Sequence, residues 1–196
     1  MTATAAVQAP RMAAADFLTW AAKRADRRYE LVRGQPVAMS PETNLHLMVK
    51  GAAFRALGDA VASAGLDCVV LPDGATVVID ADTAREPDAA IQCGRELDPD
   101  ALTLDAPIVV VEVTSPSTVS VDENDKLIEY FSVPSIAHYL VIHPRQAVVV
   151  HHSRAGAGEI RTRILRQGEI DLSPPGFTVS VAALLGPAGA TRSEQE

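Results

Sequence analysis

The chain has 196 residues, of which 47% are hydrophobic and 21% are charged, proportions typical of one soluble globular domain. Its net charge of -8 argues against binding nucleic acid through a broadly basic surface. No apolar run is long enough to cross a bilayer, and the first residues lack a basic segment leading into an apolar core. Neither a membrane partner nor a signal peptide is therefore expected.

The acidic residues gather in the middle third of the chain. Residues 61–130 contain three Lys or Arg against fifteen Asp or Glu, whereas residues 1–60 contain eight against five. Such a region is either a solvated face that keeps the protein soluble or a set of carboxylates that converge on a metal ion. Composition alone leaves both interpretations open.

The first elements are predicted from local patterns. Residues 16–22 form a short helix that begins at an acidic residue and has apolar side chains on one face. Residues 29–39 form a hairpin, because two short apolar segments flank Gly34. The longest helix follows, with Thr43 or Asn44 as its cap and an end at Gly65.

From Cys68 onward the pattern changes to short β-type segments separated by Asp, Gly and Pro. The predicted strands are residues 68–72, 75–80, 88–93 and 107–113, and later 138–143 and 147–152. Between the two groups, apolar residues at helical spacing around residues 126–131 predict a helix. The order of elements predicts an α/β fold of the α+β type, with a mixed sheet and helices packed on it.

The two cysteines are expected to be reduced. Cys68 and Cys93 lie in apolar, strand-like surroundings and have no CxxC spacing. That setting favours core thiols over a disulfide or a zinc framework. A cytoplasmic location is the consequent expectation.

Glu112 stands within an apolar, β-branched run, residues 107–113. A buried carboxylate costs several kcal/mol unless something compensates it, so it is paired, protonated or bound to a cation. A pair with an arginine such as Arg85 or Arg55 is one explanation. A metal ion is the other.

Asp88 follows Pro87 at the start of a predicted strand. It either bonds to local backbone N–H groups or meets Glu112 at one edge of the sheet, since neighbouring strands can bring both side chains together. Mg²⁺ prefers such oxygen ligands. An empty site of this kind would crowd like charges, so removing either carboxylate is expected to leave the metal-free protein equally or more stable.

Four motifs occur in one order along the chain: YELVRGQPVAMSP, REPDAAI, VVVEVTSPST and VDENDKLIEYFSVPSIAHYLVIHP. In this order they resemble the Uma family of restriction-endonuclease-like proteins, a branch of the PD-(D/E)XK nuclease superfamily. The resemblance implies a restriction-endonuclease-like mixed β-sheet core flanked by helices, as one domain over residues 14–185. Residues 1–13 are then a flexible tail and residues 186–196 a disordered tail.

The resemblance also implies an activity, the metal-dependent hydrolysis of DNA phosphodiester bonds by an endonuclease. Asp88, Glu112 and the carbonyl of Val113 would hold Mg²⁺ or Mn²⁺ beside the scissile phosphate. DNA is the expected substrate, and a homodimer is left open. The competing interpretation is a catalytically inactive nuclease-fold scaffold or protein-interaction module, which the net charge of -8 favours.

The catalytic lysine of the superfamily stands two residues after the second acidic residue, where this chain has Thr114. In the branch that the chain resembles, the following helix supplies the lysine, which here is Lys126. A lysine can serve from a new backbone position because its charge is a compact point on a long flexible stem. The alternative is a surface pair of Lys126 with Asp122, one helical turn away.

Three further residues match or depart from the family pattern. Glu30 matches the Glu of the YEL motif and is expected to add a catalytic acidic group, the alternative being an outward-facing strand carboxylate. His46 begins the long helix, where its partner is a phosphate or a structural hydrogen bond. His143 stands where relatives have Asp, a change expected to affect partners more than metal chemistry.

Overall fold

The computed structural model describes residues 11–24, 27–114, 122–156 and 158–190. The chain forms two compact units, Met1–Ser40 with Val78–Arg85 and Pro41–Val77 with Glu86–Glu196. None of the helices in the described ranges has both the length and the apolar character that a bilayer crossing demands.

The smaller unit is built on the predicted hairpin. The strands β1 (Tyr29–Val32) and β2 (Gln35–Ala38) pair antiparallel, and Arg33 and Gly34 between them both have positive φ, as a two-residue hairpin turn requires. The sheet has the order β2-β1-β5-β4, with β4 at Val77–Val78 and β5 at Ala84–Arg85. The helix α1 (Ala14–Ala21) places Phe17 in a core with Leu31.

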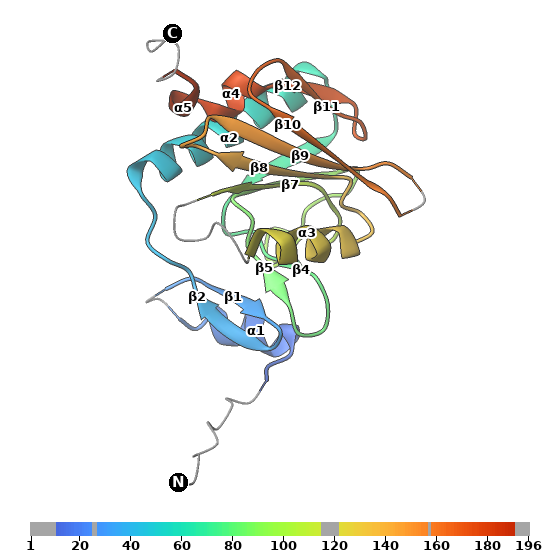
Figure 1. Ribbon diagram of the computed structural model, residues 1–196. Helices are drawn as coiled ribbons and strands as arrows, with labels where there is room; N and C mark the ends of the chain where they lie inside the picture. Colours follow the sequence, from blue (N-terminus) through green and yellow to red (C-terminus); the bar gives the residue numbers. More distant parts are fainter. Residues whose placement is uncertain (1–10, 25–26, 115–121, 157, 191–196) are drawn as a thin grey trace. The chain divides into compact units, whose positions relative to one another are not determined.

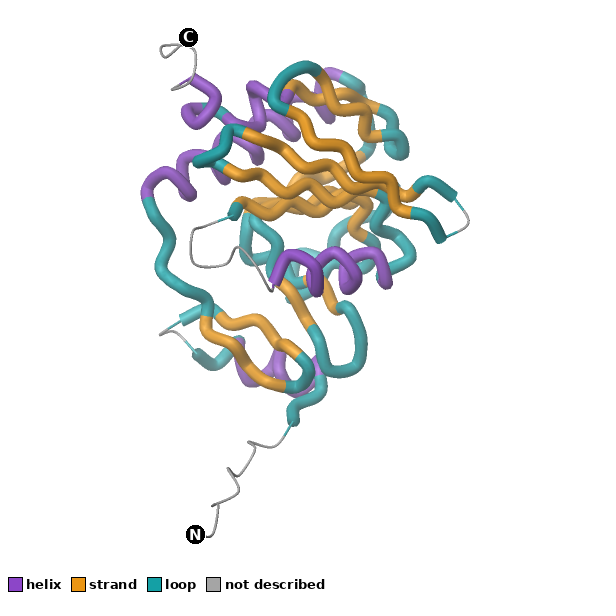
Figure 2. The backbone as a smooth tube through the Cα atoms, viewed as in Figure 1, coloured by secondary structure: helices purple, strands orange, loops and turns teal. Residues whose placement is uncertain are grey.

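The larger unit contains a six-stranded sheet of order β10-β9-β8-β7-β6-β3 (Figures 1 and 2). Its strands are β3 (Cys68–Pro72), β6 (Ala89–Cys93), β7 (Pro107–Val113), β8 (His138–His143), β9 (Val148–Arg154) and β10 (Ile160–Leu165). The pair β7 and β8 is parallel, and the other neighbours are antiparallel. The parallel pair needs a crossover, and the helix α3 (Asp122–Ser132) lies within it.

Helices cover both faces of this sheet (Figure 1). On one face lie α2 (Asn44–Ser63), α4 (Val181–Leu185) and the hairpin of β11 (Glu169–Leu172) and β12 (Phe177–Ser180). Val109, Val111 and Val113 of β7 join the core on this face. The opposite face receives α3, whose Tyr130 packs against Tyr139 of β8.

The predicted fold class is confirmed, as are the hairpin, the long helix with its Thr43 cap and most central strands. Two details differ. Sequence patterns did not predict β5, β10, β11, β12 or α4, and in β10 every residue but Leu165 is exposed. The helix α5 (Pro187–Ala190) lies within the range assigned to a disordered tail, and its Ala188 is buried in the core, so residues 187–190 are ordered.

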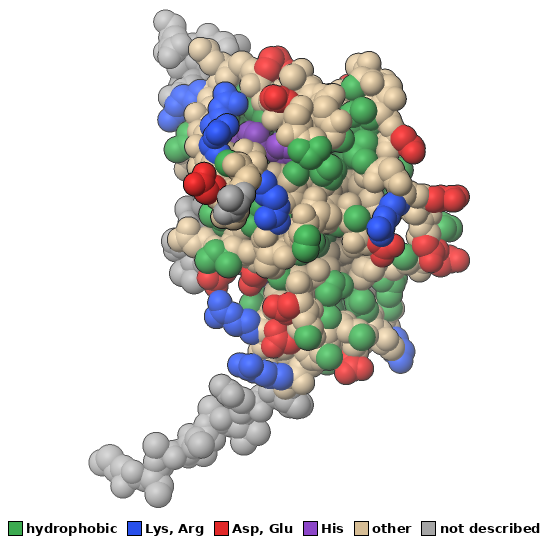
Figure 3. Space-filling view, turned by 90° about the vertical axis from the view of Figure 1, so that its right-hand side faces the viewer, with side chains coloured by type: hydrophobic (Ala, Val, Ile, Leu, Met, Phe, Trp, Pro, Cys, Tyr) green, Lys and Arg blue, Asp and Glu red, His purple; other side chains and the backbone are tan. Residues whose placement is uncertain are grey.

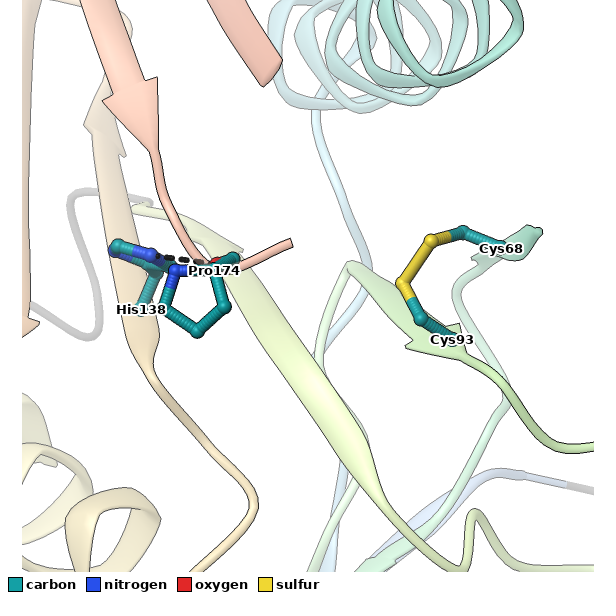
Figure 4. The surroundings of a disulfide bond; sticks show 4 residues. All are labelled: Cys68, Cys93, His138 and Pro174. Atoms are coloured by element: carbon teal, nitrogen blue, oxygen red, sulfur yellow. Dashed lines mark hydrogen bonds between the residues drawn. A yellow bond between two sulfur atoms is a disulfide. The ribbon is translucent and has the colours of Figure 1, made fainter. Parts of the chain in front are cut away.

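The prediction of reduced cysteines is wrong for this structure. Cys68 and Cys93 form a disulfide between β3 and β6, where the two residues stand directly opposite each other in the register (Figure 4). The sequence did not reveal this disulfide, because the two cysteines are 25 residues apart. They come together only through the antiparallel register of β3 and β6. The cytoplasmic location stays a prediction, without the argument from free thiols.

Candidate functional site

Asp88 lies immediately before β6, beside the end of β7. Its side chain is buried, and its Oδ2 atom accepts a hydrogen bond of 2.6 Å from the backbone N–H of Val113. Because Ala89 pairs with Val111 in the antiparallel register of these strands, Asp88 and Glu112 come from neighbouring strands, as expected. The two catalytic roles stay predictions.

The start of α2 supplies a row of polar side chains next to Asp88. His46 and Lys50 are one turn apart on one side of α2, and Glu42 immediately precedes the Thr43 cap of this helix. The ammonium of Lys50 lies 2.7 Å from Glu42 Oε1, 2.6 Å from Asp73 Oδ2 and 3.0 Å from Asp88 Oδ1. With only 7% of Lys50 exposed, one buried ammonium directs its three donors at three carboxylates.

These contacts set the charge states of Lys50 and Asp88. Burial alone would lower the pKa of Lys50, but the charge of Asp88 and the hydrogen bonds to Asp73 and Glu42 outweigh it and raise the pKa. Burial alone would raise the pKa of Asp88, yet His46, Lys50 and the N–H of Val113 together lower it. Both groups are therefore charged at neutral pH, and each stabilises the other.

His46 approaches the same carboxylates. Its Nε2 atom lies 3.6 Å from Asp88 Oδ2 and 3.9 Å from Glu42 Oε1. Glu42, His46 and Asp88 each offer one ligand atom, and these atoms all lie within 4.8 Å of one another. This group could hold a metal ion, and it includes one residue, Asp88, of the ligand set expected from the sequence.

Glu112 contacts the helix on the other side of the sheet, whereas Asp88 contacts α2, so the expectation that the two carboxylates share one ion stays a prediction. Its Oε1 atom accepts hydrogen bonds from the ammonium of Lys126 at 3.1 Å and from the hydroxyl of Tyr130 at 2.7 Å. Lys126 and Tyr130 are one helical turn apart on α3, so one face of that helix presents both donors. The lysine from the following helix thus reaches Glu112, as expected. The side chain of Asp122, its alternative partner, lies outside the described side chains.

Two other expectations about carboxylates need correction. The premise that an empty site crowds like charges is wrong, because Asp88 contacts Lys50 and Glu112 contacts Lys126. Glu30 is not outward-facing: it is buried and pairs with Arg85 at 2.9 Å within the smaller unit. A role for Glu30 in catalysis stays a prediction.

The remaining histidines lie on β8 and β9. His143 contacts the hydroxyl of Thr114, with 3.2 Å between Nδ1 and Oγ1. His138 and His151 form a buried pair with 2.9 Å between Nδ1 and Nε2, and His138 Nε2 donates to the carbonyl of Pro174 at 2.9 Å (Figure 4). That bond leaves the other nitrogen of a neutral His138 as an acceptor, so His151 Nε2 is the donor within the pair.

Sequence reasoning did not identify Lys50, Glu42, Asp73 or Tyr130. The four-residue spacing of His46 and Lys50 was a usable signal, because it places two polar side chains among the buried residues of one helix. Asp73 had no such signal. It lies 23 residues from Lys50 in the chain and reaches it only through the fold.

Comparison with known proteins gives two findings. The model of a family, Uma2, described as "Putative restriction endonuclease", matches residues 14–184. A crystal structure described as "a putative nuclease belonging to DUF820", from Anabaena variabilis, superposes with a TM-score of 0.66 at 14% sequence identity, covering 89% of this chain and 97% of that chain. At this identity the likeness concerns the fold. No curated protein of similar sequence was found.

Proposed function

The chain belongs to the Uma2 family, described as "Putative restriction endonuclease", and from that premise we propose that it is a metal-dependent endonuclease that hydrolyses DNA phosphodiester bonds. One observation carries the proposal: Lys126 reaches Glu112 at 3.1 Å, on the strand that neighbours Asp88. Hydrolysis of a phosphodiester needs carboxylates for a cation and a positive group for the phosphate or the attacking water. This chain supplies both from adjacent elements.

A divalent ion suits the donors of this region. Carboxylate oxygens are preferred ligands of Mg²⁺ and Mn²⁺, and the proposed ligands are Asp88, Glu112 and the carbonyl of Val113. The N–H of Val113 donates to Asp88, and in a strand the N–H and C=O of one residue point to the same side. A bound ion supplies an activated water and stabilises the charge that develops on the phosphate.

Lys126 has the role of positioning the attacking water or the scissile phosphate. The hydroxyl of Tyr130 and the ammonium of Lys126 donate to the same oxygen of Glu112, so Glu112 holds the ammonium in place and Tyr130 holds Glu112. Side chains fixed in this way lose little freedom when substrate binds. Glu112 therefore both binds the ion and orients the lysine.

Glu30 is proposed as a further catalytic acidic group, on the strength of its YEL motif. Its pair with Arg85 gives Glu30 a structural task as well. A Glu30→Gln protein that melts like the wild type but cleaves DNA more slowly would support the catalytic role. A loss of thermal stability without a change in cleavage rate would assign Glu30 to the Arg85 pair alone.

An inactive scaffold that binds a protein is the second candidate, and one observation favours it. Asp88 already has a cation, because Lys50 lies 3.0 Å from it, so the carboxylate does not need a metal ion to be stable. The surface charges are also mixed: Figure 3 shows basic and acidic side chains interspersed over the face it presents. Such a face resembles an ordinary solvated surface.

A cleavage assay separates the two candidates. Purified protein is incubated with supercoiled, linear and single-stranded DNA in Mg²⁺ or Mn²⁺, beside Asp88→Ala and Asp59→Ala. Asp59 is an exposed aspartate of α2 and serves as the matched control. The endonuclease cleaves at least one form, loses cleavage in Asp88→Ala and keeps it in Asp59→Ala. Cleavage that persists in Asp88→Ala contradicts the proposal, whereas no cleavage of any form favours the scaffold. A homodimer stays a prediction for size-exclusion measurements.

A further inference from the structure

His46, near the start of α2, lies farther from its two carboxylate neighbours than a hydrogen bond requires. An N–H···O hydrogen bond is about 2.9 Å long, but His46 Nε2 is 3.6 Å from Asp88 and 3.9 Å from Glu42. Ligand atoms bound about 2.1 Å from one ion are about 3.0 Å apart at the octahedral angles of Mn²⁺ and Mg²⁺, and about 3.4 Å apart at tetrahedral angles. The gap between His46 and the two carboxylates therefore has roughly the width that a shared ion requires.

His46 itself gives a second, independent indication. Only 8% of the residue is exposed, and its Nδ1 atom is buried without a hydrogen-bond partner in the described part of the chain. A buried polar nitrogen without a partner destabilises the fold. A structural hydrogen bond, which the sequence left open for His46, does not account for this placement. An imidazole that binds an ion through Nε2 and a water through Nδ1 does.

Charge in the cluster favours a further cation. Glu42, Asp73 and Asp88 all contact the ammonium of Lys50, so three carboxylates share this one positive charge. Lys50 occupies Asp88 Oδ1, whereas His46 faces Oδ2. The two oxygens of Asp88 thus serve different neighbours, with Oδ2 also accepting from the N–H of Val113.

We propose that Glu42, His46 and Asp88 bind a divalent transition-metal ion and prefer Mn²⁺ to Mg²⁺, with Lys50 limiting the affinity through its hold on the same carboxylates. The inference rests on the proposed function and deepens it, since it names two ligands and the ion selectivity. Imidazole nitrogen suits transition metals, whereas Mg²⁺ takes oxygen ligands and retains several waters. His46 is therefore the residue that discriminates between the two ions.

Isothermal titration calorimetry with Mn²⁺ alone and Mg²⁺ alone tests the proposal without DNA. The wild type should bind Mn²⁺ at least tenfold more tightly than Mg²⁺. His46→Gln should lose most of that ratio, while His152→Gln, a histidine outside the cluster that contacts Thr162, should keep it. Thermal melts without metal check that both variants fold. An unchanged ratio in folded His46→Gln overturns the inference.

Two further variants separate this inference from the nuclease proposal. Lys50→Met removes a competing positive charge and should tighten the binding of both ions at least tenfold with the ratio unchanged. Unchanged or weaker binding contradicts the role of Lys50. Glu112→Gln should keep the Mn²⁺ to Mg²⁺ ratio while losing DNA cleavage; loss of the ratio in Glu112→Gln but not in His46→Gln assigns selectivity to Glu112. If selectivity depends on His46 but the wild type cleaves no DNA, the metal site stands and the nuclease proposal fails.

Discussion

The carboxylates of Asp88 and Glu112 come from neighbouring strands but are held in different ways. Asp88 is fixed by a backbone N–H of β7 and by Lys50, which two further carboxylates hold in turn. Glu112 accepts hydrogen bonds from Lys126 and Tyr130, which both lie on the helix α3. Under the proposed function, the Asp88 side concentrates negative charge for a cation, whereas the Glu112 side places an ammonium in addition to contacting that cation.

The largest expected effect is on cleavage by Lys126→Met. If Lys126 acts on the water or the phosphate, its removal should lower kcat at least 100-fold, which corresponds to about 3 kcal/mol of transition-state stabilisation. Binding of Mn²⁺ should persist, because the proposed ligands exclude Lys126. Lys126→Arg should also be impaired, since a planar guanidinium does not replace a point charge.

Single-turnover cleavage and calorimetry on the same preparations give both readouts for Lys126. A Lys126→Met protein that cleaves DNA at the wild-type rate would return this lysine to a structural pair with Glu112. Loss of both metal binding and cleavage would show instead that Lys126 supports the cation side. The surroundings of Asp88 and Glu112 would then not differ in task.

Lys50→Met should be the most destabilising change on the Asp88 side. Removal of one partner from a buried charge cluster leaves uncompensated carboxylates, at a cost of about 3–5 kcal/mol. Urea denaturation without metal measures the loss, and saturating Mn²⁺ should restore part of it by binding the folded state. The double variant Lys50→Met with Asp88→Asn should be more stable than Lys50→Met alone. A fully stable Lys50→Met protein would mean that the cluster is solvated.

On acidification, the buried pair of His138 and His151 should become protonated at a higher pH than Asp88. Burial, and then the charge of His138, lowers the pKa of His151 to about 4 from its ordinary 6.5, and burial lowers the pKa of His138 as well. The unfolded chain therefore binds more protons between pH 6.5 and 4, and stability falls by about 2–3 kcal/mol as the pH drops through this window. The lowered pKa of Asp88 makes its contribution disappear only below pH 3.8.

Urea denaturation at a series of pH values separates these contributions. His151→Leu should flatten the curve between pH 6.5 and 4, whereas Asp59→Ala, at an exposed position on α2, should still show the fall in stability through this window. In Asp88→Ala, the free energy of unfolding should depend on pH as in the wild type between pH 6.5 and 4. Below this window it should fall less steeply than in the wild type. A wild-type protein equally stable at pH 6.5 and 4 would contradict the assignment of a neutral histidine pair.

Asp88→Ala and Glu112→Gln should differ in stability in the metal-free protein. A site that only crowded carboxylates would become more stable in either variant. Because Asp88 contacts Lys50 and accepts from Val113, we expect Asp88→Ala to lose about 2 kcal/mol. Glu112→Gln keeps an oxygen that can accept from Tyr130 and should lose about 1 kcal/mol. Thermal melts in EDTA measure both, and a gain in either would restore the crowded-site interpretation.

The fold could be predicted from local pattern more fully than the site could. Local sequence patterns within a few residues predict three elements: the hairpin around Gly34, the long helix after Thr43 and the strand that contains Glu112. The strand β10 did not, because arginines alternate with its other residues and neither side is buried. Lys126 was found through the family motif, whereas the role of Lys50 depends on carboxylates that only the folded chain brings together.

The smallest expected effect is a partial rescue, in which Thr114→Lys is combined with Lys126→Met. Glu112 stands opposite Val141 in the register with β8, and Thr114 contacts His143 two residues further on, so Thr114 and Glu112 face the same side of the sheet. A lysine at position 114 would stand where the superfamily pattern places it. We expect the double variant to cleave DNA a few-fold faster than Lys126→Met, though far more slowly than the wild type, because Glu112 and Tyr130 position an ammonium that arrives from α3. Thr114→Met with Lys126→Met is the control for bulk at position 114. Equal rates in the two double variants would mean that an ammonium on the strand cannot replace one on the helix, and that the helix sets its position.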